Sequence, residues 1–117
     1  MAQAKKQDFD AQAASLAELA RALSHPARIA ILELLAARDT CICGEIVEEL
    51  PLSQSTVSQH LKALKEAGLI QGEIEGPKTC YCLSQSGISK LKRLLPRFLG
   101  KLETATKRLS SCCEKEK

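Results

Sequence analysis

The cysteines are the residues of this chain whose type and spacing most directly suggest chemistry. Clustered thiols are typical of soft-metal sites and of redox sensors. The alternative is that the cysteines are only small residues scattered through the core, but this would not explain why they come in pairs. We therefore expect a soft-metal site or thiol redox sensing. The six cysteines form three close pairs, Cys41/Cys43, Cys80/Cys82 and Cys112/Cys113.

The segments that direct a chain to a membrane or out of the cell have no counterpart in the sequence. No apolar run approaches the ~20 residues that a membrane helix needs. The first ten residues, MAQAKKQDFD, contain no apolar core of a signal peptide. We therefore expect a cytoplasmic protein without a membrane partner. Since the cytoplasm keeps thiols reduced, we do not expect a disulfide scaffold, and neighbours within each pair are poorly placed to bridge each other.

The composition is that of one ordinary globular domain, and we treat 1–117 as a single domain with its core over 8–110. The chain has 44% hydrophobic and 26% charged residues and a net charge of +3, which permits binding to a polyanion without demanding it. With two Phe, one Tyr and no Trp, stacking on single-stranded bases is not favoured. No cysteine lies in a catalytic signature and no Gly-rich phosphate loop is present, so we do not expect an enzyme.

The periodicity predicts a mainly α-helical fold with a small β-hairpin wing. Helical stripes cover 8–23 and the segment from Pro26 onward. An extended segment, 40–43, precedes a helix-turn-helix at about 44–67, in which Pro51-Leu52 is the turn. Two strands at about 69–83 then form the wing around Gly76-Pro77, and a long helix spans about 86–110.

The second helix of the helix-turn-helix carries a polar face suited to double-stranded DNA. Ser53 is its expected N-cap, and Val57 lies at the centre of its buried face. Hydroxyls and amides read base edges in the major groove, and lysines neutralise phosphate. For His60 the sequence leaves open a phosphate contact or semi-buried packing. The predicted DNA-binding residues are Gln54, Ser55, Thr56, Ser58, Gln59, His60 and Lys62, with Lys78 on the wing.

The last helix has an unbroken heptad of apolar positions, which favours a homodimer. A lone small domain has little use for so long a stripe, and a partner's copy together with the first helix would cover it. The stripe consists of Ile88, Leu91, Leu95, Phe98, Leu102, Ala105 and Leu109.

The stretches ALSHPARIAILELL and LSQSTVSQHLKALKEAGLI, followed by a Gly-turned hairpin, resemble the ArsR/SmtB family of bacterial metal-sensing repressors. The resemblance covers roughly 16–83. It implies a winged helix-turn-helix homodimer, joined through its first and last helices, on operator DNA. It also implies that metal binding weakens the DNA complex.

The resemblance also indicates which ion to expect. The family's sites on the last helix use His and carboxylates, but here that helix has no His and no Asp, which leaves sulfur and soft ions, As(III) above all, as the inducer. The family's arsenic sensors carry a Cys-x-Cys before the turn, which Cys41-Ile42-Cys43 resembles. This pair sits one residue earlier, and Ile46 and Val47 stand where a further cysteine would be.

A geometric argument joins two of the cysteine pairs. If 40–43 forms a strand beside the second wing strand, then Ile42 and Tyr81 face the core and Cys41, Cys43, Cys80 and Cys82 share the opposite face. Three of these thiols would suit As(III), and four would suit Cd(II). Cys112 and Cys113 are alternative ligands. A thiol redox or persulfide sensor, in which the same four cysteines could form a cross-strand disulfide, remains open. So does a DNA-binding protein with incidental cysteines.

Overall fold

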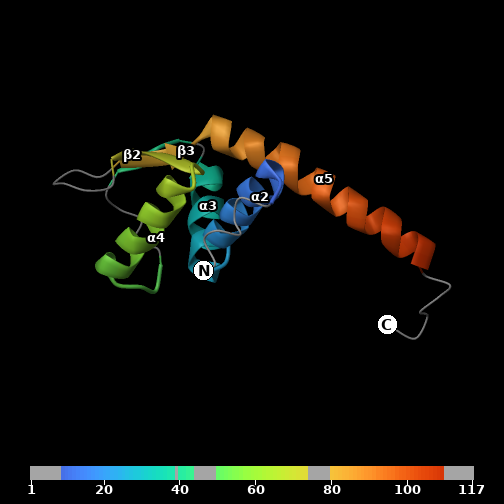
Figure 1. The fold of residues 1–117 in the computed structure, drawn as a ribbon. Helices are drawn as coiled ribbons and strands as arrows, with labels where there is room; N and C mark the ends of the chain where they lie inside the picture. Colours follow the sequence, from blue (N-terminus) through green and yellow to red (C-terminus); the bar gives the residue numbers. More distant parts are fainter. Residues whose placement is uncertain (1–8, 39, 44–49, 74–79, 110–117) are drawn as a thin grey trace, which may run out of the picture.

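Four helices and a three-stranded sheet make up the part of the chain that the structure, a computed structural model, describes (Figure 1). The described residues are 9–38, 40–43, 50–73 and 80–109. The first helix predicted for the helix-turn-helix, the tip of the wing with Lys78, and Cys112 and Cys113 lie outside them. The elements are α2 (Ala11–Ala22), α3 (Pro26–Arg38), β1 (Ile42–Cys43), α4 (Gln54–Glu66), β2 (Ile70–Glu73), β3 (Cys80–Leu83) and α5 (Gln85–Leu109).

The helices begin where the sequence supplies capping groups. Asp10 caps α2 by accepting a hydrogen bond from the Gln12 backbone N–H at 3.2 Å, so this helix begins three residues later than the predicted start at residue 8. Pro26 opens α3, where its missing N–H costs nothing. Ser53 caps α4 as predicted, since its hydroxyl accepts from the Thr56 N–H at 3.3 Å.

The sheet has the strand order β1-β3-β2, with both pairings antiparallel. β1 therefore lies beside the second wing strand, as predicted for 40–43. Gly72 of β2 stands opposite Tyr81 and has φ +127°. A Cβ on Gly72 would collide with the Cys80 carbonyl oxygen, so only glycine fits where the two strands approach this closely.

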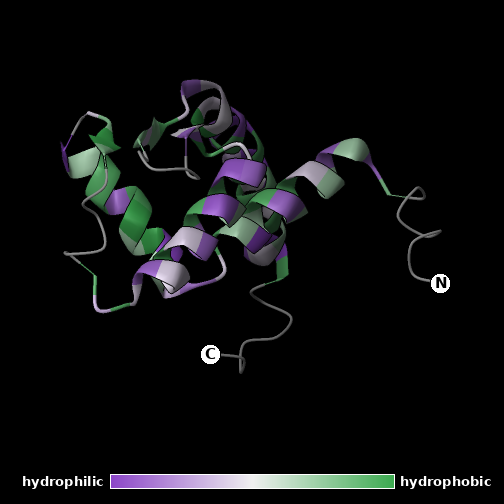
Figure 2. Cartoon of the chain, turned by 90° about the vertical axis from the view of Figure 1, so that its left-hand side faces the viewer, coloured by the Kyte–Doolittle hydropathy of each residue, from purple (hydrophilic) through white to green (hydrophobic). Residues whose placement is uncertain are grey.

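A single apolar core lies between the helices and the inner face of the sheet. Figure 2 shows hydrophobic and hydrophilic residues alternating along the helices, as expected for helices with one face on a core. The most buried large side chains come from α3, α4, the segment leading into β2, and the sheet. They are Ile31, Leu35, Leu64, Leu69, Ile70 and Tyr81.

The long helix α5 packs on α2 through its middle, where Arg97 bonds to Gln12, and then leaves the body of the protein. Leu94 is buried in the core cluster, whereas Phe98, Leu102 and Leu109 are 45%, 48% and 55% exposed. Figure 1 shows the C-terminal half of α5 extending away from the sheet and the other helices. Within the described residues, no helix is both long and apolar enough to cross a membrane.

Candidate functional site

The outer face of α4 is polar and open to solvent. Thr56 is half-buried, and the exposed predicted residues are Gln54, Ser55, Ser58, Gln59 and Lys62. Val57, Leu61 and Leu64 are buried on the opposite face. The helix thus presents amides, hydroxyls and a lysine on one side, which is the arrangement that a DNA reading helix requires.

The N-terminus of α4 is tied together by hydroxyl groups. The Ser53 hydroxyl lies 3.0 Å from that of Thr56 and 3.3 Å from that of Ser55. These bonds accompany the cap and fix the first turn, where free backbone N–H groups point outward. Such a turn is suited to contact a phosphate.

His60 differs from the other predicted DNA-binding residues because it is buried, with 8% of its surface exposed. Its Nδ1 atom accepts a hydrogen bond from Nε of Arg28 in α3 at 3.1 Å. Burial lowers the pKa of His60 from the ordinary value of 6.5, and the nearby charges of His25 and Arg28 lower it further. Of the two roles that the sequence left open for His60, its position favours packing over phosphate contact.

Four cysteines meet on one face of the sheet, as the strand argument predicted. The register pairs Ile42 with Tyr81 and Cys43 with Cys80. Ile42 and Tyr81 are buried at 3% and 1% exposure, and the cysteines on either side of them point to the other face.

The sulfurs of these cysteines are joined across the strands. The structure contains the disulfides Cys41–Cys82 and Cys43–Cys80, with Cα atoms 4.3 Å and 4.0 Å apart. The sequence predicted no disulfide scaffold, but its redox alternative allowed a disulfide across the two strands. Its argument ruled out bridges within each Cys-x-Cys pair, where side chains are poorly placed, but antiparallel pairing brings cysteines of different pairs to neighbouring positions.

Two polar residues of β2 share the face that carries the cysteines. Gln71 stands opposite Cys82, and Glu73 opposite Cys80, and directly opposed residues of an antiparallel pair lie on the same side of a sheet. The sequence assigned Glu73 no role at the cysteine site. Its position beside Cys80 follows from the register, which the sequence alone did not fix.

The cysteine face also borders a cavity. This cavity, of about 370 Å³, is lined by Cys41 and Cys82 together with Thr40, Leu35, Ala36 and Leu83. Among the described residues, no group of three or more His, Cys, Asp or Glu side chains is arranged around one point as metal ligands would be. With the sulfurs paired in disulfides, the cluster must be reduced before it can bind an ion.

Backbone hydrogen bonds connect the sheet to the end of α4. The Leu69 N–H donates to the Leu64 carbonyl at 3.0 Å, and the Ser84 N–H donates to the Leu69 carbonyl at 2.9 Å. Ser84 directly follows β3, which carries Cys80 and Cys82. A short chain of bonds therefore runs from the cysteine strand to the last turn of the polar helix.

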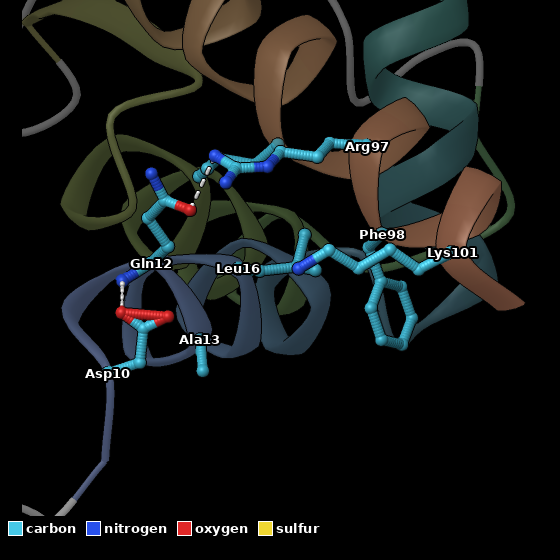
Figure 3. A pocket seen from close by; sticks show the side chains of 8 residues that line it. Asp10, Gln12, Ala13, Leu16, Arg97, Phe98 and Lys101 are labelled. Carbon is cyan, nitrogen blue, oxygen red and sulfur yellow. Dashed lines mark hydrogen bonds between the residues drawn. The ribbon is translucent and has the colours of Figure 1, made fainter.

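A second concave region lies between α2 and α5. It encloses about 110 Å³, and Figure 3 shows Arg97 of α5 reaching Gln12 of α2, with Phe98 and Lys101 lining the same region. Nη1 of Arg97 donates to Oε1 of Gln12 at 2.7 Å. This bond fixes α5 against α2 next to the point where its apolar stripe becomes exposed.

Comparison with known proteins is consistent with this geometry. Residues 25–71 match the family described as "Bacterial regulatory protein, arsR family". The chain is 42% identical over 74 residues to the HTH-type transcriptional repressor SmtB of Mycobacterium tuberculosis, covering 63% of this chain and 54% of that protein. The chain thus spans about half the length of this relative.

Two further relatives are matched over more of their length. The HTH-type transcriptional regulator YgaV of Escherichia coli is 31% identical over 83 residues, which cover 71% of this chain and 84% of that protein. The solved structure of HlyU from Vibrio cholerae superposes with a TM-score of 0.60 at 32% identity, covering 77% of this chain and 97% of that one. The chain therefore belongs to the arsR family of bacterial regulatory proteins, whose members are DNA-binding transcriptional regulators and not enzymes.

Proposed function

We propose that this protein is a transcriptional repressor that releases its operator DNA when a thiophilic ion, with arsenite as the best fit, binds its cysteine thiolates. The observation that carries the proposal is the pairing of β1 with β3, which gathers four cysteine sulfurs on one face of the sheet. The reduced cluster is all sulfur, and sulfur selects soft ions over Mg²⁺ or Ca²⁺. The ligands are drawn from Cys41, Cys43, Cys80 and Cys82.

The DNA contacts of this proposal lie on α4. Its exposed side chains would read the major groove, and the capped N-terminus would contact phosphate. Lys78, outside the described residues, remains a proposed wing contact. The residues proposed to meet DNA directly are Gln54, Ser55, Thr56, Ser58, Gln59, Lys62 and Lys78.

The proposed repressor is a homodimer joined through its first and last helices. In support, Phe98, Leu102 and Leu109 form an exposed apolar stripe on α5, and Phe9 beside α2 is 64% exposed. A second copy would cover these side chains, and a two-fold axis would present two α4 helices to successive major grooves. Because the operator DNA of a bacterium lies in the cytoplasm, the proposed repressor would act there.

Ion binding would act on DNA affinity through the bonds between the sheet and α4. Ligation by cysteines of both strands would change the spacing of β1 and β3 from that of the free thiols. The bonds through Leu69 would pass this change to the last turn of α4. A small rotation of α4 is enough to move its side chains away from base edges.

A redox sensor is the second candidate, favoured by the two cross-strand disulfides. In this case two thiols and one molecule of hydrogen peroxide give one disulfide and two molecules of water, so that each pair loses two electrons and two protons to the peroxide. The disulfides would then replace the ion as the signal at the same cysteines.

Titration of the reduced protein–DNA complex separates the two candidates. We expect arsenite to release the DNA, and Cys→Ser changes at Cys41 and Cys82, or at Cys43 and Cys80, to abolish this release while DNA binding persists. Release by peroxide but not by arsenite would favour the redox sensor. Release by neither reagent would contradict both candidates.

A further inference from the structure

A cluster of one arginine and two histidines lies where α2, α3 and α4 meet. Arg28, in the first turn of α3, donates from Nε to Nδ1 of His60 in α4 at 3.1 Å. Nη1 of the same guanidinium donates to the backbone carbonyl of Arg21, in the last turn of α2, at 3.2 Å. One side chain thus connects the end of α2 to the middle of α4.

The second histidine lies directly against the first. The ring centroids of His25 and His60 are 4.4 Å apart. Nδ1 of His25 accepts a hydrogen bond from the Ala27 backbone N–H at 3.0 Å, at the start of α3. Both rings therefore use Nδ1 as an acceptor, which requires that neither Nδ1 carries a proton.

We propose that Arg28 is a positioning residue for DNA recognition, which holds α4 against α2 and α3 while His60 is neutral and lets α4 shift when His60 takes up a proton. The inference rests on the proposed function, in which α4 reads DNA. The inference makes low pH a second signal that weakens DNA binding. The contact that responds to it lies on the opposite side of α4 from the exposed polar face and is separate from the cysteines.

The chemistry of the three side chains gives the direction of the effect. A proton on Nδ1 of His60 would turn the acceptor into a donor that faces the Nε–H of Arg28. The hydrogen bond is then lost, and two positive charges face each other. Among the described residues, the charged or titratable groups acting on His60 are His25, just before α3, and Arg28 in α3, and both are basic.

The pKa of His60 supports the same direction. Burial lowers it below 6.5, followed by the charges of His25 and Arg28. His60 is held neutral while α4 is packed against α2 and α3, but it can take up a proton once α4 has shifted. The packed arrangement is therefore fully favoured above about pH 6.5. It loses this advantage as the pH falls below that value.

Three variants test the proposal. Arg28→Lys keeps the charge but lacks the planar fork that reaches both His60 and Arg21. His60→Asn places an amide oxygen near the position of Nδ1, where it can accept from Arg28 and never becomes charged. Arg93→Lys is the matched control, because Arg93 is exposed on α5, outside the cluster.

The measurement is binding of the reduced, metal-free protein to a duplex of about 30 base pairs, selected by the unmodified protein from a random pool. Thermal melts of each variant at each pH accompany the titrations. At about pH 7.5 we expect Arg28→Lys to weaken binding by about tenfold or more, and Arg93→Lys and His60→Asn to bind within about threefold of the unmodified protein.

The pH profile is the readout that a merely structural role would not change. Between about pH 7.5 and about pH 5.5 we expect the unmodified protein to lose affinity, and His60→Asn to lose much less. A His60→Asn profile as steep as that of the unmodified protein, or Arg28→Lys binding at full strength, would overturn the inference. If arsenite still releases the DNA in that case, the proposed function stands; if no DNA is selected at all, both fail.

Discussion

Replacing Gly72 with alanine tests whether β2 and β3 approach as closely as the structure shows. Gly72 has φ +127°, and a Cβ there would collide with the backbone oxygen of Cys80. A non-glycine residue in this backbone region costs about 1–3 kcal/mol. The collision is with backbone, which cannot rotate away as a side chain can, so overpacking adds about 1–3 kcal/mol.

The expected loss of unfolding free energy for Gly72→Ala is thus about 2–6 kcal/mol. For a domain of this size, each kcal/mol corresponds to a fall in Tm of about 3–6 °C. We therefore expect the Tm to fall by about 6 °C or more, measured by circular dichroism at one fixed protein concentration, since a dimer's Tm depends on concentration.

Gly100→Ala is the matched control. Gly100 lies in α5, and a Cβ added there would have nothing within 4 Å, so alanine should stabilise the helix by about 0.5–1 kcal/mol. A Tm of Gly72→Ala close to that of the unmodified protein would refute the reasoning. An equal fall for Gly100→Ala would show that the loss does not come from the strand contact.

Three further tests, of the DNA contacts, of the dimer and of the pH dependence, rest on the same structure. Gln59→Ala should weaken specific DNA binding by about 1–3 kcal/mol. Lys62→Ala should weaken binding to all sequences alike and reduce the slope of log affinity against log salt concentration by about one. Equal effects of the two changes in a salt titration would contradict these roles. Phe98→Glu should convert the dimer to a monomer in sedimentation, and Lys90→Glu, exposed on the same helix, should leave it unchanged. Unfolding free energy should decline as the pH falls below about 6.5, because the unfolded chain then binds more protons than the folded one with its lowered His60 pKa, and His60→Asn should flatten that decline in chemical denaturation.

The fold was predictable from the sequence where local patterns and caps agree. The bounds of α4 were predicted nearly to the residue from the Ser53 cap and the buried face around Val57. Those of α5 were predicted equally closely from the heptad on the last helix. The prediction was wrong at the start of α2, where Asp10 caps the helix and a periodic stripe alone suggested an earlier beginning.

The site was predictable only where strand alternation decides it. Alternation about Ile42 and Tyr81 correctly placed four cysteines on one face. The link from Arg28 to His60 was not predictable, because the two residues are 32 positions apart and no periodicity fixes how α3 crosses α4. The neighbours of the cysteines on β2 depend in the same way on a register that the sequence leaves open.

The central claim is that the chemical state of the four strand cysteines controls DNA binding, and one titration tests it most directly. Arsenite is added to the reduced complex of protein and fluorescent duplex while fluorescence anisotropy reports release. We predict release by the unmodified protein and by a Cys112→Ser, Cys113→Ser variant, but not by a variant with serine at Cys41 and Cys82. Release that survives the loss of Cys41 and Cys82 but fails without Cys112 and Cys113 would contradict the account.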